Sequence, residues 1–317
     1  MTRLIHRRAA IQFATASVVG LFVPGRADAT GTSYYYDSLG RVVRVEFPNG
    51  SSVVYSYDDA GNRVVIARSG STASPVWTRT IAITGTGSVN LYFLATTAGY
   101  VPLLANGLAQ DAVVTFTLAS SVTITGSPGG VSGDKGAAGI EIGAWPITQA
   151  YIQLALQISG TVRGGGGNGA EGDSGAGGDG GDAIDCSAPI AITINSTATV
   201  KAGGGGGGGG LRSSNGKFGG GGGGGGAATG LAGAGGEGDN ANGHNGNSGT
   251  TTGGGSGGTG GGSGATAGGA GGSYATAGSN GVAGGGTGGA AGYAIRKNGF
   301  AVSVDNTHGG TITGSVG

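Results

Sequence analysis

The segment Thr199-Val-Lys-Ala-Gly-Gly-Gly-Gly-Gly-Gly-Gly-Gly210 runs from strand-like residues directly into unbroken glycine. It belongs to a polar tract from about Gly164 to Gly292, which holds most of the 81 glycines of the chain and a second unbroken run, Gly219 to Gly226. Glycine has no side chain to bury and loses the most conformational freedom on folding, so this tract cannot build a hydrophobic core. It is therefore either disordered or ordered by packing of backbone against backbone.

The ordered alternative is a stack of polyproline II helices, in which the absent side chains let neighbouring backbones exchange hydrogen bonds. Collagen is excluded, because it needs glycine at every third position and this spacing appears only locally, at Gly243, Gly246 and Gly249. Strand-like segments lie on both sides of the tract and interrupt it at residues 183–201. This bracketing favours an ordered tract.

The sequence before the tract predicts β-structure. From about Thr80 to Ile158, apolar residues alternate with Thr, Ser or Gln and β-branched types dominate, as in Val113-Val-Thr-Phe-Thr-Leu118. Val89-Asn-Leu-Tyr-Phe-Leu94 is interpreted as a further strand, and a helix is credible only around Ala95 to Gln110. The expected fold class is all-β with a glycine-rich polyproline II helical sandwich, and with little or no α-helix apart from a signal peptide.

An internal repeat with a period of 21 residues precedes this region: Tyr34-Tyr-Tyr-Asp-Ser-Leu-Gly-Arg41 returns as Tyr55-Ser-Tyr-Asp-Asp-Ala-Gly-Asn-Arg63. Each copy predicts a β-hairpin with an Asp-x-x-Gly turn. The pattern resembles the YD repeats of the RHS family, whose many copies coil into β-shells around secreted toxins. Only about two copies are present here. We therefore expect a small hairpin module rather than a shell.

The N-terminus has the composition of an export signal. Basic residues come first, then a mild apolar run to Val23, then Ala27-Asp-Ala29 as a cleavage site. Arg7-Arg8 fits the twin-arginine route, although Ala10 or Ile11 stands where a phenylalanine usually follows, so the general route stays open. A retained N-terminal helix is the alternative.

These patterns divide the chain into five segments: an export signal peptide at 1–29, YD-repeat hairpins at 30–70, a β-rich domain at 71–162, a glycine-rich polyproline II region at 163–292 with a strand insertion at 183–201, and C-terminal β-strands at 293–317.

The composition excludes several classes of function. With 16 basic and 16 acidic residues, the chain offers no electrostatic case for nucleic acid or an anionic membrane. Three histidines and Cys186 alone supply neither a zinc site nor a disulfide framework, and the lone thiol is expected to be packed. Carboxylates and histidines such as Glu171 and His244 lie in polar, glycine-rich sequence that predicts no pocket around them. We expect no enzyme, no cofactor and no transmembrane segment after signal cleavage.

One segment of the tract has a pattern typical of calcium-binding repeats. Gly177-Gly-Asp-Gly-Gly-Asp-Ala-Ile-Asp185 fits a single copy of a calcium-binding nonapeptide, with Asp179, Asp182 and Asp185 as oxygen ligands. That motif works as a tandem array, and no second copy precedes it. The alternative is a solvated acidic turn.

From about Thr80 to Gly317 the order of strands and glycine runs is specific, as in Ile158-Ser-Gly-Thr-Val-Arg-Gly-Gly-Gly-Gly-Asn-Gly169 and the closing Gly309-Gly-Thr-Ile-Thr-Gly314. This succession resembles the glycine-rich phage tail-fibre tip proteins. The resemblance implies a β-sheet base bearing a sandwich of polyproline II glycine helices, whose distal loops bind a host surface receptor.

Carried onto this chain, the resemblance makes the non-glycine interruptions of the tract the distal loops. Their side chains offer stacking faces and hydrogen-bond donors for a protein or glycan. For any one residue, the alternative is a turn that merely caps the glycine helices. The candidates for receptor binding are Arg212, Lys217, Phe218, His244, Asn245 and Tyr274.

We therefore expect a secreted or surface-exposed bacterial protein that is non-enzymatic and adhesin-like, with a cell-surface protein or glycan as its partner. A phage tip protein needs no export signal, so the signal favours a bacterial protein that borrowed this architecture. The alternative is a structural glycine-rich matrix or envelope protein without a specific ligand. Ice binding is disfavoured, because the tract's threonines, such as Thr259 and Thr266, form no regular array.

Overall fold

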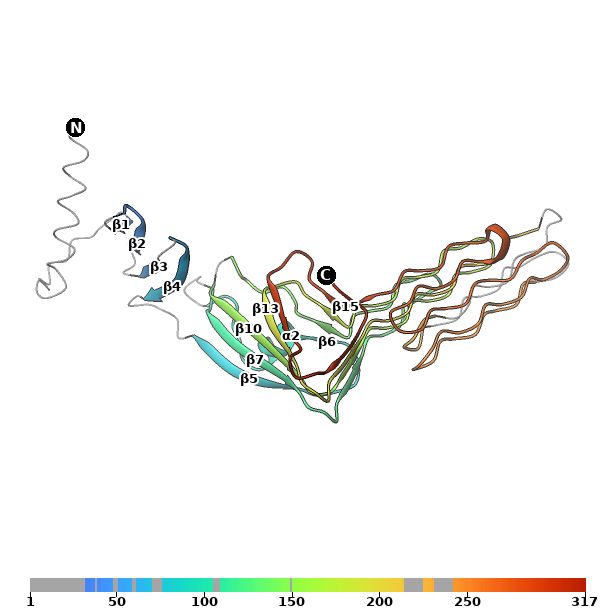
Figure 1. Ribbon diagram of the computed structural model, residues 1–317, viewed down its shortest axis with the longest axis horizontal. Coiled ribbons are helices and arrows are strands. Elements are labelled where there is room, and N and C mark those ends of the chain that lie inside the picture. Colours follow the sequence, from blue (N-terminus) through green and yellow to red (C-terminus); the bar gives the residue numbers. More distant parts are fainter. Residues whose placement is uncertain are drawn as a thin grey trace, which may run out of the picture. The chain divides into compact units, whose positions relative to one another are not determined.

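The computed structural model describes two units of the chain, one within Met1–Pro75 and one within Val76–Gly317 (Figure 1). The described residues are mostly β-strands and glycine-rich backbone, with very little helix. This confirms the expectation of an all-β fold. None of the described helices is long and apolar enough to cross a membrane. The export signal lies outside the described residues, which are 32–37, 39–47, 51–58, 61–69, 76–104, 109–148, 150–213, 225–230 and 242–317.

The first unit is a four-stranded antiparallel sheet in the order β1-β2-β3-β4, and its turns follow from the repeat. Asp37 Oδ1 accepts hydrogen bonds from the backbone N–H groups of Leu39 and Arg41, each at 2.9 Å, and Gly40 takes φ +78°. The hairpin prediction is confirmed. The strands are β1 (Ser33–Tyr36), β2 (Val42–Glu46), β3 (Ser52–Tyr57) and β4 (Arg63–Ser69).

The second unit is a coil of parallel strands in three sheets. The first sheet contains β5 (Trp77–Ile83), β7 (Ala112–Leu118), β10 (Ile152–Ile158), β13 (Ile190–Ile194) and β16 (Val302–Asp305). The second sheet contains β8 (Thr123–Thr125), β11 (Thr161–Arg163), β14 (Thr199–Lys201) and β17 (Thr311–Thr313). The third sheet contains β6 (Val89–Asn90), β9 (Ile140–Glu141), β12 (Ile184–Asp185), β15 (Tyr293–Arg296) and β18 (Ser315–Val316).

The first turn contributes only β5 and β6, and each later turn visits the three sheets in the same order, as β7, β8 and β9 do before β10 begins the next turn. The period-two pattern of the sequence decides which side chains point inward, because successive side chains of a strand face opposite sides. Along β7, Val114, Phe116 and Leu118 are buried, whereas Val113 and Thr115 are only partly so. The inward residues of all three sheets form one hydrophobic core, in which Cys186 is also buried, as expected.

The corner between the third and first sheets carries the aromatic residues and the helix. Tyr100 and Trp145 lie with ring centroids 5.2 Å apart, and Tyr92 lies 5.3 Å from Trp145. The helix α2 (Leu91–Thr97) begins after Asn90, whose side chain accepts a hydrogen bond from the N–H of Phe93. The strand predicted from Val89 to Leu94 is correct only at β6, and the predicted helix began and ended too late, because this cap starts a helix that the apolar pattern alone does not reveal.

The corner between the second and third sheets is where the glycine tract leaves the coil. Successive turns insert residues 126–139, 164–183 and 202–292 at this same corner. In Figure 1 these insertions extend from the coil as long arms that lie side by side. The longest insertion, between β14 and β15, contains the 3-10 turn η1 (Val282–Gly284).

Backbone hydrogen bonds join the arms with a repeat of three residues. The N–H groups of Gly203, Gly206 and Gly209 donate to the carbonyls of Gly181, Gly178 and Gly175 at 2.8 to 2.9 Å. The carbonyls of the same three glycines accept from Gly292, Gly289 and Gly286 at 2.8 to 3.1 Å. A Cβ on any of the three would collide with a backbone carbonyl of a further arm, that of Gly165, Asn168 or Glu171. These three positions therefore require glycine, because each lies where its arm contacts three other arms.

Candidate functional site

The described turns that bear on the predicted loops fall into two groups, which we call near turns and the far turn. The near turns, residues 227–229, 250–253 and 273–276, return to the coil. Ala228 accepts a hydrogen bond from the N–H of Gly166 at 3.0 Å, and Ala275 donates one to Ala202 at 3.2 Å. The far turn, residues 261–264, lies at the opposite end, beside the buried Ser213. Only the far end is remote from the coil.

Arg212 lies at the far end and is exposed. Its neighbour Leu211 forms two hydrogen bonds with Thr266, one to the hydroxyl at 2.7 Å and one from the backbone N–H at 3.1 Å. The arm that carries Arg212 is thereby fixed to the arm that follows the far turn. A loop candidate predicted from the sequence thus lies on an ordered backbone.

His244 and Asn245 are also exposed, on another arm. The N–H of His244 donates to Thr259 at 2.9 Å, which places it close to the far turn. Two arms, residues 254–260 and 265–272, lie between it and the arm of Arg212, as the bonds from Gly268 to Gly258 and from Gly269 to Gly208 show. The far end therefore presents a cationic group on one arm and imidazole and amide groups on another. Lys217 and Phe218 lie outside the described residues.

Tyr274 does not lie in a distal loop, and that prediction was wrong. It belongs to a near turn and is half-buried, with its hydroxyl donating to the carbonyl of Thr251 at 2.7 Å. The Lys201 Nζ lies 5.1 Å from its ring centroid and the Arg163 Cζ lies 6.0 Å from it. A break in the glycine pattern marks a turn but does not say at which end of an arm the turn lies.

The three aspartates of the nonapeptide motif serve the junction of tract and coil. Asp182 is 2 % exposed, and its oxygens accept from Arg296 Nε at 2.7 Å, Arg296 Nη2 at 2.9 Å and the Tyr293 N–H at 2.7 Å. Lys135 Nζ adds an ion pair at 3.2 Å. The interpretation of a solvated acidic turn is wrong for Asp182. Its hydrogen bonds raise the pKa of the Arg296 guanidinium above the usual value.

Asp179 and Asp185 are also engaged. Asp179 accepts from the N–H of Ala290 at 2.7 Å, and Asp185 accepts from the amide of Asn298 at 2.6 Å. In the described ranges, no three His, Cys, Asp or Glu side chains are grouped so that they could hold a metal ion. The motif here joins residues more than a hundred positions apart, which its local pattern does not indicate.

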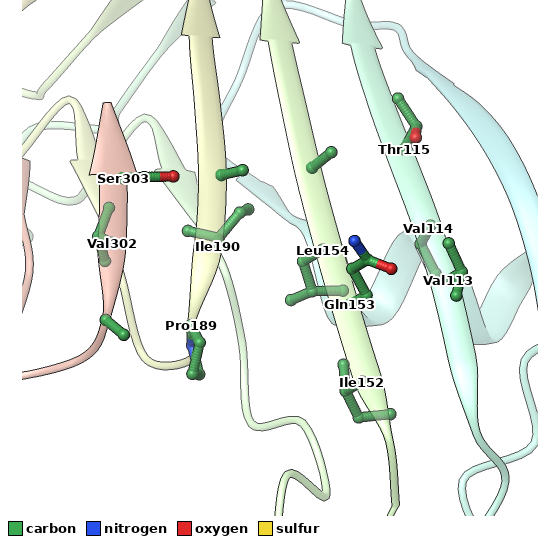
Figure 2. Close-up of a pocket in the computed structure, with 13 residues that line it drawn as sticks. Val113, Val114, Thr115, Ile152, Gln153, Leu154, Pro189, Ile190, Val302 and Ser303 are labelled. Carbon is green, nitrogen blue, oxygen red and sulfur yellow. The ribbon is translucent and has the colours of Figure 1, made fainter. Parts of the chain in front are cut away.

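Two further surface features lie on the coil. A hollow of about 610 Å³ is lined by β7, β10, β13 and β16, with Val113, Gln153 and Ser303 among its side chains and no ionisable residue in its lining (Figure 2). At the corner of the aromatic residues, Phe93 and Leu103 are 66 % and 62 % exposed. Phe93 lies in α2 and Leu103 in the segment that follows it, and single exposed apolar residues of this kind are ordinary on protein surfaces. Sequence patterning missed both, because neither has a local signature.

Comparison with known proteins gave two family matches. The model of the phage tail fibre adhesin Gp38 matches residues 78–317, and the model of the RHS repeat matches residues 36–72. These are the regions in which the sequence resembled a tail-fibre tip protein and the YD repeats, so both resemblances are confirmed.

Among solved structures, the crystal structure of the gp37–gp38 adhesin tip complex of the long tail fibre of bacteriophage S16 is similar. It has 24 % sequence identity and a TM-score of 0.49, and the likeness covers 77 % of this chain and 88 % of that chain. No curated protein matches the chain significantly.

Proposed function

Because the chain belongs to the phage tail fibre adhesin Gp38 family, we propose that it binds a cell-surface protein or glycan through the far end of its glycine tract. The family match over residues 78–317 carries this proposal. Function in such proteins resides in particular side chains held by a scaffold. The exposed Arg212, His244 and Asn245 at the far end, together with Lys217 and Phe218, are the groups we assign to recognition.

The scaffold in this proposal is a sandwich of polyproline II helices. A polyproline II helix has three residues per turn, so every third residue faces the same neighbour. The hydrogen bonds of Gly203, Gly206 and Gly209 follow this interval on both sides. Gly281, the residue before η1, has φ −60° and ψ 151°, which lies in the polyproline II region. These observations favour an ordered scaffold of glycine backbone that holds the recognition groups in place.

We further propose that the protein acts without catalysis and outside the cell that makes it. The hollow on the first sheet has no ionisable lining residue, so it offers no general acid or base. His244 is exposed, which does not provide the desolvated setting that tunes a catalytic group. Export would follow from the basic and apolar N-terminal segment that ends at Ala29, as the sequence predicts.

Binding of fluorescently labelled protein to a panel of bacterial cells tests the proposal. We expect the protein to label some strains and not others, and the variant Arg212→Ala/Phe218→Ala/His244→Ala to lose most of that labelling. Thr252→Ala is the matched control, because Thr252 is equally exposed but lies in a near turn. Uniform or absent labelling that the triple variant leaves unchanged would favour a structural matrix or envelope protein instead.

A further inference from the structure

The outer face of the second sheet carries a regular array of hydroxyl groups. In β8, β11, β14 and β17 the middle residue points into the core, so the first and third residues point outward. The strands pair in register, so the first residues form one row across all four strands. That row is Thr123, Thr161, Thr199 and Thr311.

The next row places two cations side by side. It contains Thr125, Arg163, Lys201 and Thr313, in which Arg163 and Lys201 are direct partners on neighbouring strands. Neighbouring strands lie about 4.8 Å apart. Like charges directly opposite each other destabilise a sheet, so this row costs stability unless something offsets the repulsion.

The described part of the chain provides no carboxylate that forms an ion pair with Arg163 or Lys201, whereas Arg41, Arg44 and Arg296 each pair with one. The Nε–H of Arg163 is buried and has no hydrogen-bond partner among the described residues. A buried donor of this kind has a substantial desolvation cost when it is unpaired. The ring of Tyr274 faces both cations and offsets part of the repulsion by cation–π attraction, but it gives this donor no acceptor.

We propose that this face binds an oxyanion, a phosphate or carboxylate group carried by a saccharide. Arg163 and Lys201 supply the charge and the donors, and Thr125 and Thr313 supply hydroxyls on either side of them. Guanidinium and ammonium groups bind such anions through short, charge-assisted hydrogen bonds. Tyr274, half-buried beside the cations, adds an apolar ring edge next to the charge, which suits an anion carried by a saccharide rather than a free inorganic ion. The rigid parallel sheet holds these groups in place before the ligand arrives.

This site lies at the coil, at the opposite end of the arms from Arg212, and it does not depend on receptor binding there. The array was not visible in the sequence, where the four triplets Thr-Ile-Thr, Thr-Val-Arg, Thr-Val-Lys and Thr-Ile-Thr are separated by up to 109 residues of other chain. Only the parallel register brings them together.

Titration calorimetry of the full chain at low salt with glucose 6-phosphate, glucuronate and glucose tests the proposal. We expect binding of at least one of the two anions, no binding of glucose, and affinity that falls as salt is added. Binding of the phosphate alone, the carboxylate alone or both identifies the anion, and each of these supports the site. If neither anion gives a binding heat, or if glucose binds as tightly as the anions do, the proposal is overturned.

Variants locate the site. Arg163→Gln/Lys201→Gln should weaken anion binding at least tenfold, whereas the charge-conserving Arg163→Lys/Lys201→Arg should retain most of it. Arg79→Gln, which removes an exposed cation of β5 on the first sheet, is the control and should bind as the parent does. The Gln variant removes a repulsion, so it should unfold at the same or a higher temperature. Unchanged affinity in the Arg163→Gln/Lys201→Gln variant, or an equal loss in Arg79→Gln, would contradict this placement.

Discussion

Replacing Gly206 by alanine should destabilise the tract strongly, although alanine normally stabilises a chain relative to glycine. The N–H of Gly206 donates to Gly178 and its carbonyl accepts from Gly289, both at 2.8 Å. A Cβ here would collide with the carbonyl of Asn168, which is backbone and cannot rotate away. The arm that contains Asn168 must therefore move.

The size of the effect follows from those contacts. Overpacking costs about 1–3 kcal/mol. Displacing Asn168 also weakens its bonds to Asp134 at 3.0 Å and from Gly178 at 2.8 Å, at about 1 kcal/mol each. Restricting the unfolded chain returns about 0.4–1 kcal/mol. We expect a net loss of roughly 2–4 kcal/mol in the free energy of unfolding of the tract.

Denaturant unfolding followed by circular dichroism measures this loss. Gly253→Ala is the matched control within the same tract, because the nearest atom to a Cβ there is the Thr250 hydroxyl at 4.0 Å. That variant should change the free energy of unfolding by less than about 0.5 kcal/mol. If Gly206→Ala is as stable as Gly253→Ala, the arms do not pack backbone against backbone as described.

Two further predictions concern buried groups, one in the core of the coil and one at the junction of coil and tract. Burial raises the pKa of the Cys186 thiol from 9.0 to about 12. Native protein at pH 8 should therefore resist iodoacetamide until it is unfolded, and rapid labelling without unfolding would show that the thiol is accessible. Because the folded pKa is the higher one, the stability that the neutral thiol contributes is present below pH 9 and is lost as pH rises toward 12. Asp182→Asn should lower the free energy of unfolding by roughly 2 kcal/mol, less than a fully buried ion pair because Arg296 is 30 % exposed. Asp185→Asn, which loses one partly exposed acceptor for Asn298, should cost under about 1 kcal/mol, and equal losses in a thermal melt would contradict the central role of Asp182.

The sequence indicated the strands because their signal is local. Alternation in Val113 to Leu118 places every second side chain in the core, and Asp37 and Gly40 build a turn from their own chemistry. The coil has no such signal. β14 and β15 are consecutive strands of one turn, yet Lys201 and Tyr293 are separated by the whole of the longest insertion.

The candidate site was predictable only in its residue types. Arg212, His244 and Asn245 interrupt glycine and are exposed at the far end, whereas Tyr274 interrupts glycine in the same way and lies against the coil. Which end a turn occupies depends on how many times the chain has already reversed, and no single residue encodes that number. Asp182 resembled a metal ligand because its partner Arg296 lies 114 residues away.

Hydrogen–deuterium exchange of the glycine amides tests the central claim, that the tract is an ordered scaffold. The N–H groups of Gly203, Gly206 and Gly209 each donate to a neighbouring arm, so their exchange should be slowed by several orders of magnitude relative to an unstructured chain. Gly87, which lies in an exposed turn on the coil, should exchange quickly and serves as the internal reference. Exchange of the three tract amides at the rate of an unstructured peptide would contradict the ordered tract and, with it, the placement of recognition groups at its far end.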